Sequence, residues 1–398
     1  MTLQPHLLND TIQISPEDHI LMLNSASDPY VPVAAQQLTT GTITLAEDNI
    51  ASLHEAEQQS LLFHNLRHIP FHEYALKEPP ATMDIAIMNL LYQPAKAWMI
   101  YAIQLAAYAL KPGARLYVIG AKDRGILSIA KQMEEIFGNV ETLLISKGHR
   151  VVSSYKREVA SGHPTGKNNM EQFARYSSII SEPDENPFDG GEAKGSSKSQ
   201  KNSEQFTHYL SQISESGGNA PAASALLAAL HGPSVFAQGK LDEGTRLLIE
   251  ALEVQPTDNA LDIGCGAGFI GLHIARQATR GHVTMVDASL VSVALAQQNI
   301  AESGLTNIKV LPSDGAQAVL SQRFDLVVTN PPFHHGGIQT TEIAERFIRE
   351  ASHVLRPGGR FYLVANRFLK YEPTLRTHFK KVEEVAGDPR FKVLRALA

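Results

Sequence analysis

Apolar runs and helix-like stretches alternate through the second half of this 398-residue chain. The strand-like runs are ALDIG at 260–264, VTMV at 283–286, IKVL at 308–311 and FDLVVT at 324–329. Helical spacing follows near 270–279, near 290–301 and over 342–355, where the apolar positions are Ile343, Phe347, Ile348, Ala351, Val354 and Leu355. RPGG then turns the chain into RFYLVA. This alternation predicts an α/β fold with a doubly wound, mostly parallel sheet, which binds ligands at the carboxyl ends of its strands.

The first half of the chain repeats the pattern of the second. HILML at 19–23 matches NALDI at 259–263, and GTITLAED at 41–48 matches GHVTMVDA at 281–288, both at an offset of 240. MDIAIMN at 83–89 matches FDLVVTN at 324–330 at an offset of 241, and LKPGARLYVIG from 110 matches LRPGGRFYLVA from 355 at 245. Four matches in the same order predict an internal duplication that gives two tandem Rossmann-like domains.

Composition separates the two halves. Residues 181–205 combine Pro, Gly, Ser and charge with a single aromatic, so they bury too little surface to offset the entropy of ordering. We therefore expect one domain over 1–180, a polar linker over 181–205 and a second domain over 206–398. With 43% apolar residues, the length also suits two domains better than one.

Charge and cysteine content limit the functions. The formal charge is 35 − 41 = −6, so any contact with nucleic acid must be local. The candidate cations form two runs, one of Lys147, Arg150, Lys156 and Arg157 and one of Lys380, Lys381, Arg390, Lys392 and Arg395. The only cysteine, Cys265, excludes an internal disulfide and a multi-cysteine zinc site. The first 20 residues have no signal-peptide pattern, and no long apolar run occurs, so we expect a cytoplasmic protein that binds no membrane.

A glycine-rich turn follows the first strand of the second half. In DIGCGAG at 262–268, Gly264, Gly266 and Gly268 allow a tight turn and close approach to a ligand. The dinucleotide fingerprint would place its next glycine at 269, where this chain has Phe269. Polar residues then end the successive strands, in the order Asp262, Asp287, Asp314 and Asn330. A glycine turn alone also fits a tight strand-to-helix connection, but this order favours a nucleotide-like cofactor, and the missing glycine at 269 disfavours a dinucleotide.

The segment NPPF at 330–333 has the groups that an aromatic amine needs. Such an amine is a poor nucleophile, because its lone pair is delocalised into the ring. Two acceptors that hold its hydrogens out of plane favour attack, and the Asn330 side-chain carbonyl and the Pro331 backbone carbonyl are candidates. Pro331 and Pro332 make the turn rigid, and Phe333 is placed to stack on the base. By itself NPPF also fits a rigid turn after a strand.

His334 and His335 follow at once. Adjacent histidines point in different directions, and no cluster at ligand spacing accompanies them, so we expect no metal. We favour the interpretation that the two histidines form a rim of the site and contact the phosphate or the base of the substrate.

These motifs resemble those of class I S-adenosylmethionine-dependent methyltransferases, over 233–398. The resemblance implies that Asp262 and the loop with Gly264, Gly266 and Gly268 lie against the methionine part of the cofactor. It further implies that Asp287 holds the ribose, that Asp314 meets the adenine and that Asn330 lies beside the methyl group.

TNPPFHHGG, the stretch PSVFAQGKLDEGTRLLIEAL at 233–252 and the degenerate first half together resemble the ribosomal RNA guanine-N2 methyltransferases. In that family the C-terminal domain is catalytic, and the N-terminal duplicate assists RNA recognition and stability. The resemblance implies that Phe236 and Gln238 approach the cofactor or the flipped base. The implied partner is ribosomal RNA or an assembling ribosomal subunit, and we expect a monomer.

Other functions stay open at this point. The NPP[FY] class includes adenine, cytosine, guanine and protein glutamine methyltransferases. A protein glutamine or small-molecule amine methyltransferase is the main alternative, and a silent RNA-binding assembly factor is a further one. In the first half, the three loop glycines correspond to Asn24, Ala26 and Asp28, while Glu47 stands opposite Asp287. NLLY at 89–92 lacks both prolines. We therefore expect the first half to be degenerate and to bind no cofactor.

Overall fold

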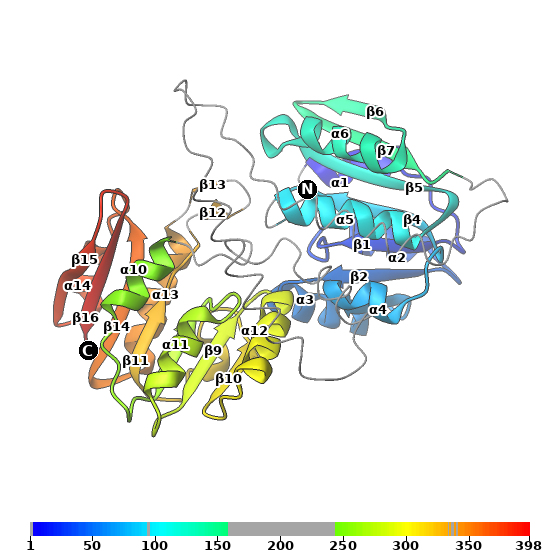
Figure 1. The fold of residues 1–398 in the computed structure, drawn as a ribbon. Coiled ribbons are helices and arrows are strands. Elements are labelled where there is room, and N and C mark those ends of the chain that lie inside the picture. Colours follow the sequence, from blue (N-terminus) through cyan, green and yellow to red (C-terminus); the bar gives the residue numbers. More distant parts are fainter. Residues whose placement is uncertain (1–2, 94–95, 158–242, 333, 336–337, 340) are drawn as a thin grey trace, which may run out of the picture. The chain divides into compact units, whose positions relative to one another are not determined.

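The computed structural model describes residues 3–93, 96–157, 243–332, 334–335, 338–339 and 341–398 (Figure 1). The linker expected at 181–205 lies outside the described residues, as do Phe236, Gln238 and Phe333. Each half of the chain forms its own seven-stranded sheet.

The N-terminal half alternates strands and helices from its first strand onward. Its elements are α1 (Leu3–Thr11), β1 (His19–Leu23), α2 (Tyr30–Gln37), β2 (Thr42–Glu47), α3 (Ile50–Leu62), β3 (Leu66–Pro70), η1 (Phe71–Glu73), α4 (Tyr74–Lys77), β4 (Met83–Asn89), α5 (Lys96–Ala109), β5 (Leu110–Ala121), η2 (Lys122–Arg124), α6 (Ile126–Phe137), β6 (Glu141–Ser146) and β7 (His149–Tyr155). The strand order is β3-β2-β1-β4-β5-β7-β6. Strands β1 to β5 pair in parallel, whereas β7 and β6 form an antiparallel end to the sheet.

The C-terminal half has the same plan. Its elements are α10 (Glu243–Ala251), β8 (Ala260–Ile263), α11 (Phe269–Gln277), β9 (Val283–Asp287), α12 (Leu290–Ser303), β10 (Ile308–Pro312), η3 (Gln317–Val319), β11 (Phe324–Thr329), β12 (His334–His335), β13 (Ile338–Gln339), α13 (Glu342–Val354), β14 (Leu355–Asn366), α14 (Glu372–His378), β15 (Lys381–Gly387) and β16 (Phe391–Leu397). The order β10-β9-β8-β11-β14-β16-β15 repeats that of the first sheet, strand for strand. The four sequence matches therefore fall on equivalent strands, and the expected fold class is confirmed.

One detail of the expected turn is wrong. RPGG does not precede the last parallel strand but lies inside β14, which already begins at Leu355. Leu355 pairs with Phe324 and Arg360 pairs with Leu326, so the residues between them form a bulge. Gly358 has a φ of +80°, a conformation that favours glycine at this position.

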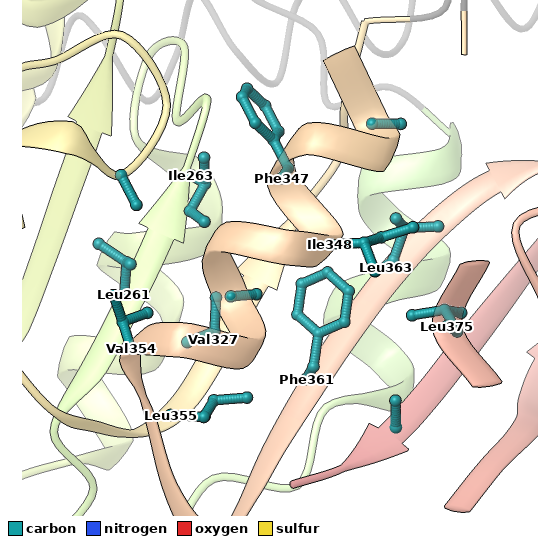
Figure 2. Packing of buried hydrophobic residues seen from close by; sticks show 14 of the residues in the cluster. Leu261, Ile263, Val327, Phe347, Ile348, Val354, Leu355, Phe361, Leu363 and Leu375 are labelled. Carbon is teal, nitrogen blue, oxygen red and sulfur yellow. The ribbon is translucent and has the colours of Figure 1, made fainter. Parts of the chain in front are cut away.

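Apolar side chains on both faces of the second sheet hold its helices. On one face, Phe347, Ile348 and Val354 of α13 pack on strand residues that include Val327 and Phe361, as Figure 2 shows. On the other face, Leu248 of α10 and the apolar residues of α11 and α12 pack on Leu326, Val328 and their neighbours. Because side chains alternate along a strand, consecutive residues of β11 serve opposite faces. The helices on both faces leave the carboxyl strand ends as the ligand-binding edge.

Candidate active site

The polar residues singled out in the sequence gather at one edge of the second sheet. Strands β10, β9, β8 and β11 are neighbours in that order, and Asp314, Asp287, Asp262 and Asn330 lie in them or directly after them. Ile263 pairs with Val286 on one side and with Thr329 on the other. The strand ends are therefore level, and the structure brings these four side chains to one end of the domain.

The glycine loop is an open backbone surface. Gly264, Gly266 and Gly268 have φ values of +73°, +56° and +85°. A Cβ at Gly266 would meet nothing within 4 Å, so its backbone conformation, and not crowding, favours glycine there. The Gly266 N–H donates to Asp287 Oδ2 at 2.8 Å, and Asn299 Nδ2 donates to the Ala267 carbonyl at 2.8 Å. These contacts hold the loop in a shape that presents its backbone to a ligand.

Asp262 is fully buried beneath this loop. Its Oδ2 accepts a hydrogen bond from the Gly271 N–H at 3.0 Å, but its Oδ1 has no partner among the described residues. Burial raises the pKa of Asp262 to about 7, although the Gly271 hydrogen bond lowers it. A buried acceptor without a donor is costly, so this oxygen fits a donor supplied by a ligand. An ammonium group, such as that of a bound methionine moiety, has the required charge.

Asp287 and Asp314 extend the acidic edge. Asp287 Oδ1 accepts from the Ser289 N–H at 2.8 Å, and burial raises the Asp287 pKa despite these backbone hydrogen bonds. Both oxygens of Asp314 accept from Arg346 on α13, with Nη1 to Oδ2 at 2.7 Å and Nη2 to Oδ1 at 2.5 Å. One turn further along α13, the buried Glu350 accepts from the Ala316 N–H at 2.8 Å. Helix α13 thus contacts the loop after β10 at two points, neither of which was predicted from the sequence.

Asn330 follows β11 next to the glycine loop. Thr329 Oγ1 donates to the Ile263 carbonyl at 2.8 Å, which ties the end of β11 to the end of β8. The Asn330 side chain donates through Nδ2 to Thr245 Oγ1 at 2.9 Å. Pro331 is buried and Pro332 is half-buried. These contacts hold the segment that has the two proposed acceptors for an amine, the Asn330 side-chain carbonyl and the Pro331 backbone carbonyl.

The two histidines enter a short hairpin. His334 and His335 form β12, which pairs antiparallel with β13 (Ile338–Gln339). Their side chains lie outside what the structure describes. In the described part of the chain, no three His, Cys, Asp or Glu residues gather as a metal site would require. None of the described helices is long and apolar enough to cross a membrane.

The N-terminal half keeps the framework of this site and fills it with its own side chains. Glu47 Oε1 accepts from the Ala26 N–H at 2.6 Å, as Asp287 accepts from Gly266, and Asn24 has a φ of +46° where Gly264 has +73°. Asp28, at the third glycine position, is buried and accepts from the Asn89 amide at 2.7 Å.

Gln93 is a second buried amide beside the loop of Asn24, Ala26 and Asp28. Gln93 Nε2 donates to the carbonyls of Leu23, Asn24 and Asn89 at 2.9, 3.3 and 3.1 Å. Glu47 is also buried, and this raises its pKa to about 8, although hydrogen bonds from Ala26 and Ser25 lower it. Asn24 and Asp28 therefore place polar side chains at two of the three positions at which the C-terminal half presents glycine, and Ala26 places a methyl group at the third.

The second run of candidate cations forms ion pairs within its own domain. Four of its five residues are in ion pairs: Lys381 with Glu383, Arg390 with Glu243, Lys392 with Glu372 and Arg395 with Glu253 and Glu383. Such pairs compete with phosphate, so this run is a poor candidate for RNA contact. In the first run, Lys156 donates to the Leu110 carbonyl at 2.7 Å, whereas Lys147 is exposed.

Comparisons with known proteins follow the same division. Residues 227–395 match the family model of the Methyltransferase small domain, and residues 16–143 match that of the Methyltransferase small domain N-terminal. The Ribosomal RNA small subunit methyltransferase C of Shewanella pealeana is 31% identical over 339 residues, which cover 82% of this chain and 85% of that protein. The chain belongs to the ribosomal RNA small subunit methyltransferase C family.

Some relatives of this family match a smaller part of the chain. That of Hahella chejuensis is 38% identical over 165 residues, or 42% of this chain, so the chain covers about half (48%) of that relative. Among solved structures, the T. thermophilus 16S rRNA N2 G1207 methyltransferase, in complex with AdoMet and guanosine, aligns with a TM-score of 0.68 and 25% identity. The alignment covers 99% of this chain and 91% of that one. The resemblance to methyltransferases drawn from the sequence is confirmed.

Proposed function

We propose that this chain transfers a methyl group from S-adenosylmethionine to the exocyclic N2 amine of a guanine in small-subunit ribosomal RNA. The observation that carries the proposal is the edge where Asp262, Asp287, Asp314 and Asn330 meet the open glycine loop. Membership of the family adds the substrate class, and the T. thermophilus relative holds AdoMet together with guanosine. The family also points to the small subunit, which the sequence alone left open.

The residues of this edge fit the cofactor. The unpaired Oδ1 of Asp262 receives the methionine ammonium, and the loop from Gly264 to Gly268 lies along the methionine part. Asp287 accepts hydrogen bonds from the ribose hydroxyls, and Asp314 accepts one from the adenine amine. When bound, the cofactor supplies a methyl group on a positively charged sulfur.

Asn330 and the prolines orient the amine. The Asn330 carbonyl and the Pro331 backbone carbonyl accept the two N2 hydrogens, and Phe333 stacks on the guanine ring. The nitrogen lone pair forms the new N–C bond while the C–S bond breaks and its electrons stay on sulfur. The nitrogen then loses one proton to water. No strong base is required, because orientation of a reactive methyl donor accounts for most of the rate.

The division of labour between the halves is part of the proposal. The catalytic domain comprises 206–398, and the linker over 181–205 joins it to the domain over 1–180, which contributes RNA recognition and stability. Phe236, Gln238, His334 and His335 contact the substrate or the cofactor at the rim. The enzyme works in the cytoplasm, where ribosomal subunits are assembled, as a monomer and without a metal.

Transfer of a tritiated methyl group tests this proposal against its alternatives. Full-length protein is incubated with the labelled cofactor and, separately, with ribosomal RNA from a strain lacking the gene and with protein release factors. We expect label in the small-subunit RNA, in N2-methylguanine. Label in protein alone would identify a glutamine methyltransferase, and no label in any substrate would favour the assembly factor.

A further inference from the structure

Helix α10 supplies a hydrogen-bond acceptor to the side chain of Asn330. Thr245 lies 85 residues earlier in the chain, and its Oγ1 accepts from Asn330 Nδ2 at 2.9 Å. An asparagine amide has a donor end and an acceptor end, and a half-turn of the side chain exchanges them. In the structure the contact with Thr245 engages the donor end, and it ties the side chain of Asn330 to α10.

The position of Thr245 is fixed by the way α10 is held on the sheet. Leu248, one turn along the helix, is fully buried in the core beneath β14 and β16. Glu243 at the start of the helix is paired with Arg390. After its end, the Glu253 carbonyl accepts from Arg360 at 2.8 Å. The buried Leu248 and the contacts at both ends set the place of the helix on the sheet, and with it the place of the Thr245 hydroxyl.

We propose that Thr245 is a positioning residue for methyl transfer, acting through Asn330. The inference rests on the proposed function, in which the Asn330 carbonyl accepts a hydrogen from the guanine N2 amine. If the amide turned over, its NH2 group would face an amine that needs an acceptor, and two donors would oppose each other. Thr245 holds the Asn330 side chain in place before the substrate arrives, with the NH2 group on its hydroxyl.

The effect belongs to the chemical step and not to cofactor binding. Loss of a positioned acceptor lowers catalytic rates by roughly 10-fold to 100-fold, since misplaced groups forfeit most of their benefit. We therefore expect Thr245→Val, which keeps the shape and removes the hydroxyl, to lower kcat by about 10-fold to 100-fold. Thr245→Ser keeps the hydroxyl and should retain kcat to within about threefold.

The experiment uses the full-length protein, labelled S-adenosylmethionine and small ribosomal subunits from a strain lacking the gene. For Thr245→Val, Thr245→Ser and the wild type, kcat and KM are measured together with the cofactor Kd by calorimetry. Arg246→Ala is the matched control, because the neighbouring Arg246 side chain is 59% exposed and pairs with Glu250 on the same helix. We expect the control to behave as wild type and the cofactor Kd to stay unchanged in all variants.

Several results would overturn the inference. These are a normal kcat in Thr245→Val, an equal loss in Thr245→Ser, or a loss confined to cofactor KM. A double mutant with Asn330→Ala should be no slower than Asn330→Ala alone, since Thr245 acts only through that side chain. A slow Asn330→Ala beside a normal Thr245→Val refutes the role of Thr245 alone. A normal Asn330→Ala refutes the catalytic assignment itself.

Discussion

The stability of the N-terminal domain should depend on pH through buried carboxyls, and Glu47 can be tested separately from Asp48 and Asp28, whose pKa values burial also raises. The Glu47 side chain is 2% exposed, and burial raises its pKa from an ordinary 4.5 to about 8. A raised pKa in the folded state means that folding favours the protonated form. The stabilisation is therefore fully present below pH 4.5 and is lost as pH rises through about 8.

The size of the effect follows from the interval between the two pKa values. Each pH unit within it corresponds to about 1.4 kcal/mol, so the loss between pH 5 and pH 8 is roughly 3 to 4 kcal/mol. Glu47→Gln removes the titration, so the difference in unfolding free energy between wild type and variant should change by this amount over the same range. A constant offset from the substitution cancels in that comparison.

The only tryptophan of the chain makes the assay specific for this domain. Trp98 is buried in the N-terminal half, against Phe71 and Tyr101. Its fluorescence during urea unfolding of the full-length protein, at pH values from 5 to 8, gives the free energy of unfolding. Glu134→Gln on α6 is the control, because that side chain is exposed. Parallel pH curves for wild type and Glu47→Gln would refute the reasoning.

The remaining predictions concern the C-terminal site. The raised Asp262 pKa lies at about 7, so cofactor binding should weaken below pH 7, by up to about tenfold in Kd per pH unit. Calorimetry at several pH values measures this effect, and a cofactor Kd that does not change with pH would contradict it. Asn330→Ala should leave the cofactor Kd nearly unchanged but lower kcat by at least about 100-fold. A normal rate of this variant in a single-turnover assay would place the catalytic centre elsewhere. Arg346→Leu should weaken cofactor binding by about tenfold and reduce discrimination between S-adenosylhomocysteine and its inosine analogue, because Asp314 loses its bidentate partner. Arg346→Lys should restore neither the affinity nor the discrimination, since a lysine ammonium cannot form the paired contact with Asp314. Calorimetry on the full-length chain should find one cofactor per chain, and two would show that the N-terminal copy is open.

Periodicity predicted the parallel strands because they are short, apolar and buried on both faces. The segments 260–264, 283–286, 308–311 and 324–329 all became strands, each within a residue or two. The antiparallel ends of both sheets were not predicted. In β15, KVEEVAG has no buried residue, and charged residues interrupt its valines, so its sequence lacks the continuous apolar run on which the other predictions depended.

The site could be predicted in part, for the same physical reason. Parallel strands place their carboxyl ends side by side, so residues that follow successive strands must meet. Contacts between distant helices and loops carry no such regularity. Thr245, Arg346 and Glu350 contact Asn330, Asp314 and Ala316 because of tertiary packing alone. The N-terminal half shows the same limit of prediction. Its lost glycines are visible in the sequence, whereas the hydrogen bond from the Asn89 amide to Asp28 is not.

The central claim is that Asn330 in the C-terminal half directs methylation of a guanine in small-subunit ribosomal RNA. The most direct test is mass mapping of methylated guanines in ribosomal RNA from a strain lacking the gene, complemented with the wild type or with Asn330→Ala. We expect one N2-methylguanine of the small-subunit RNA to be absent from the deletion strain, to return with the wild type and to stay absent with the variant. A full set of methylated guanines in the deletion strain, or their return with Asn330→Ala, would contradict the account.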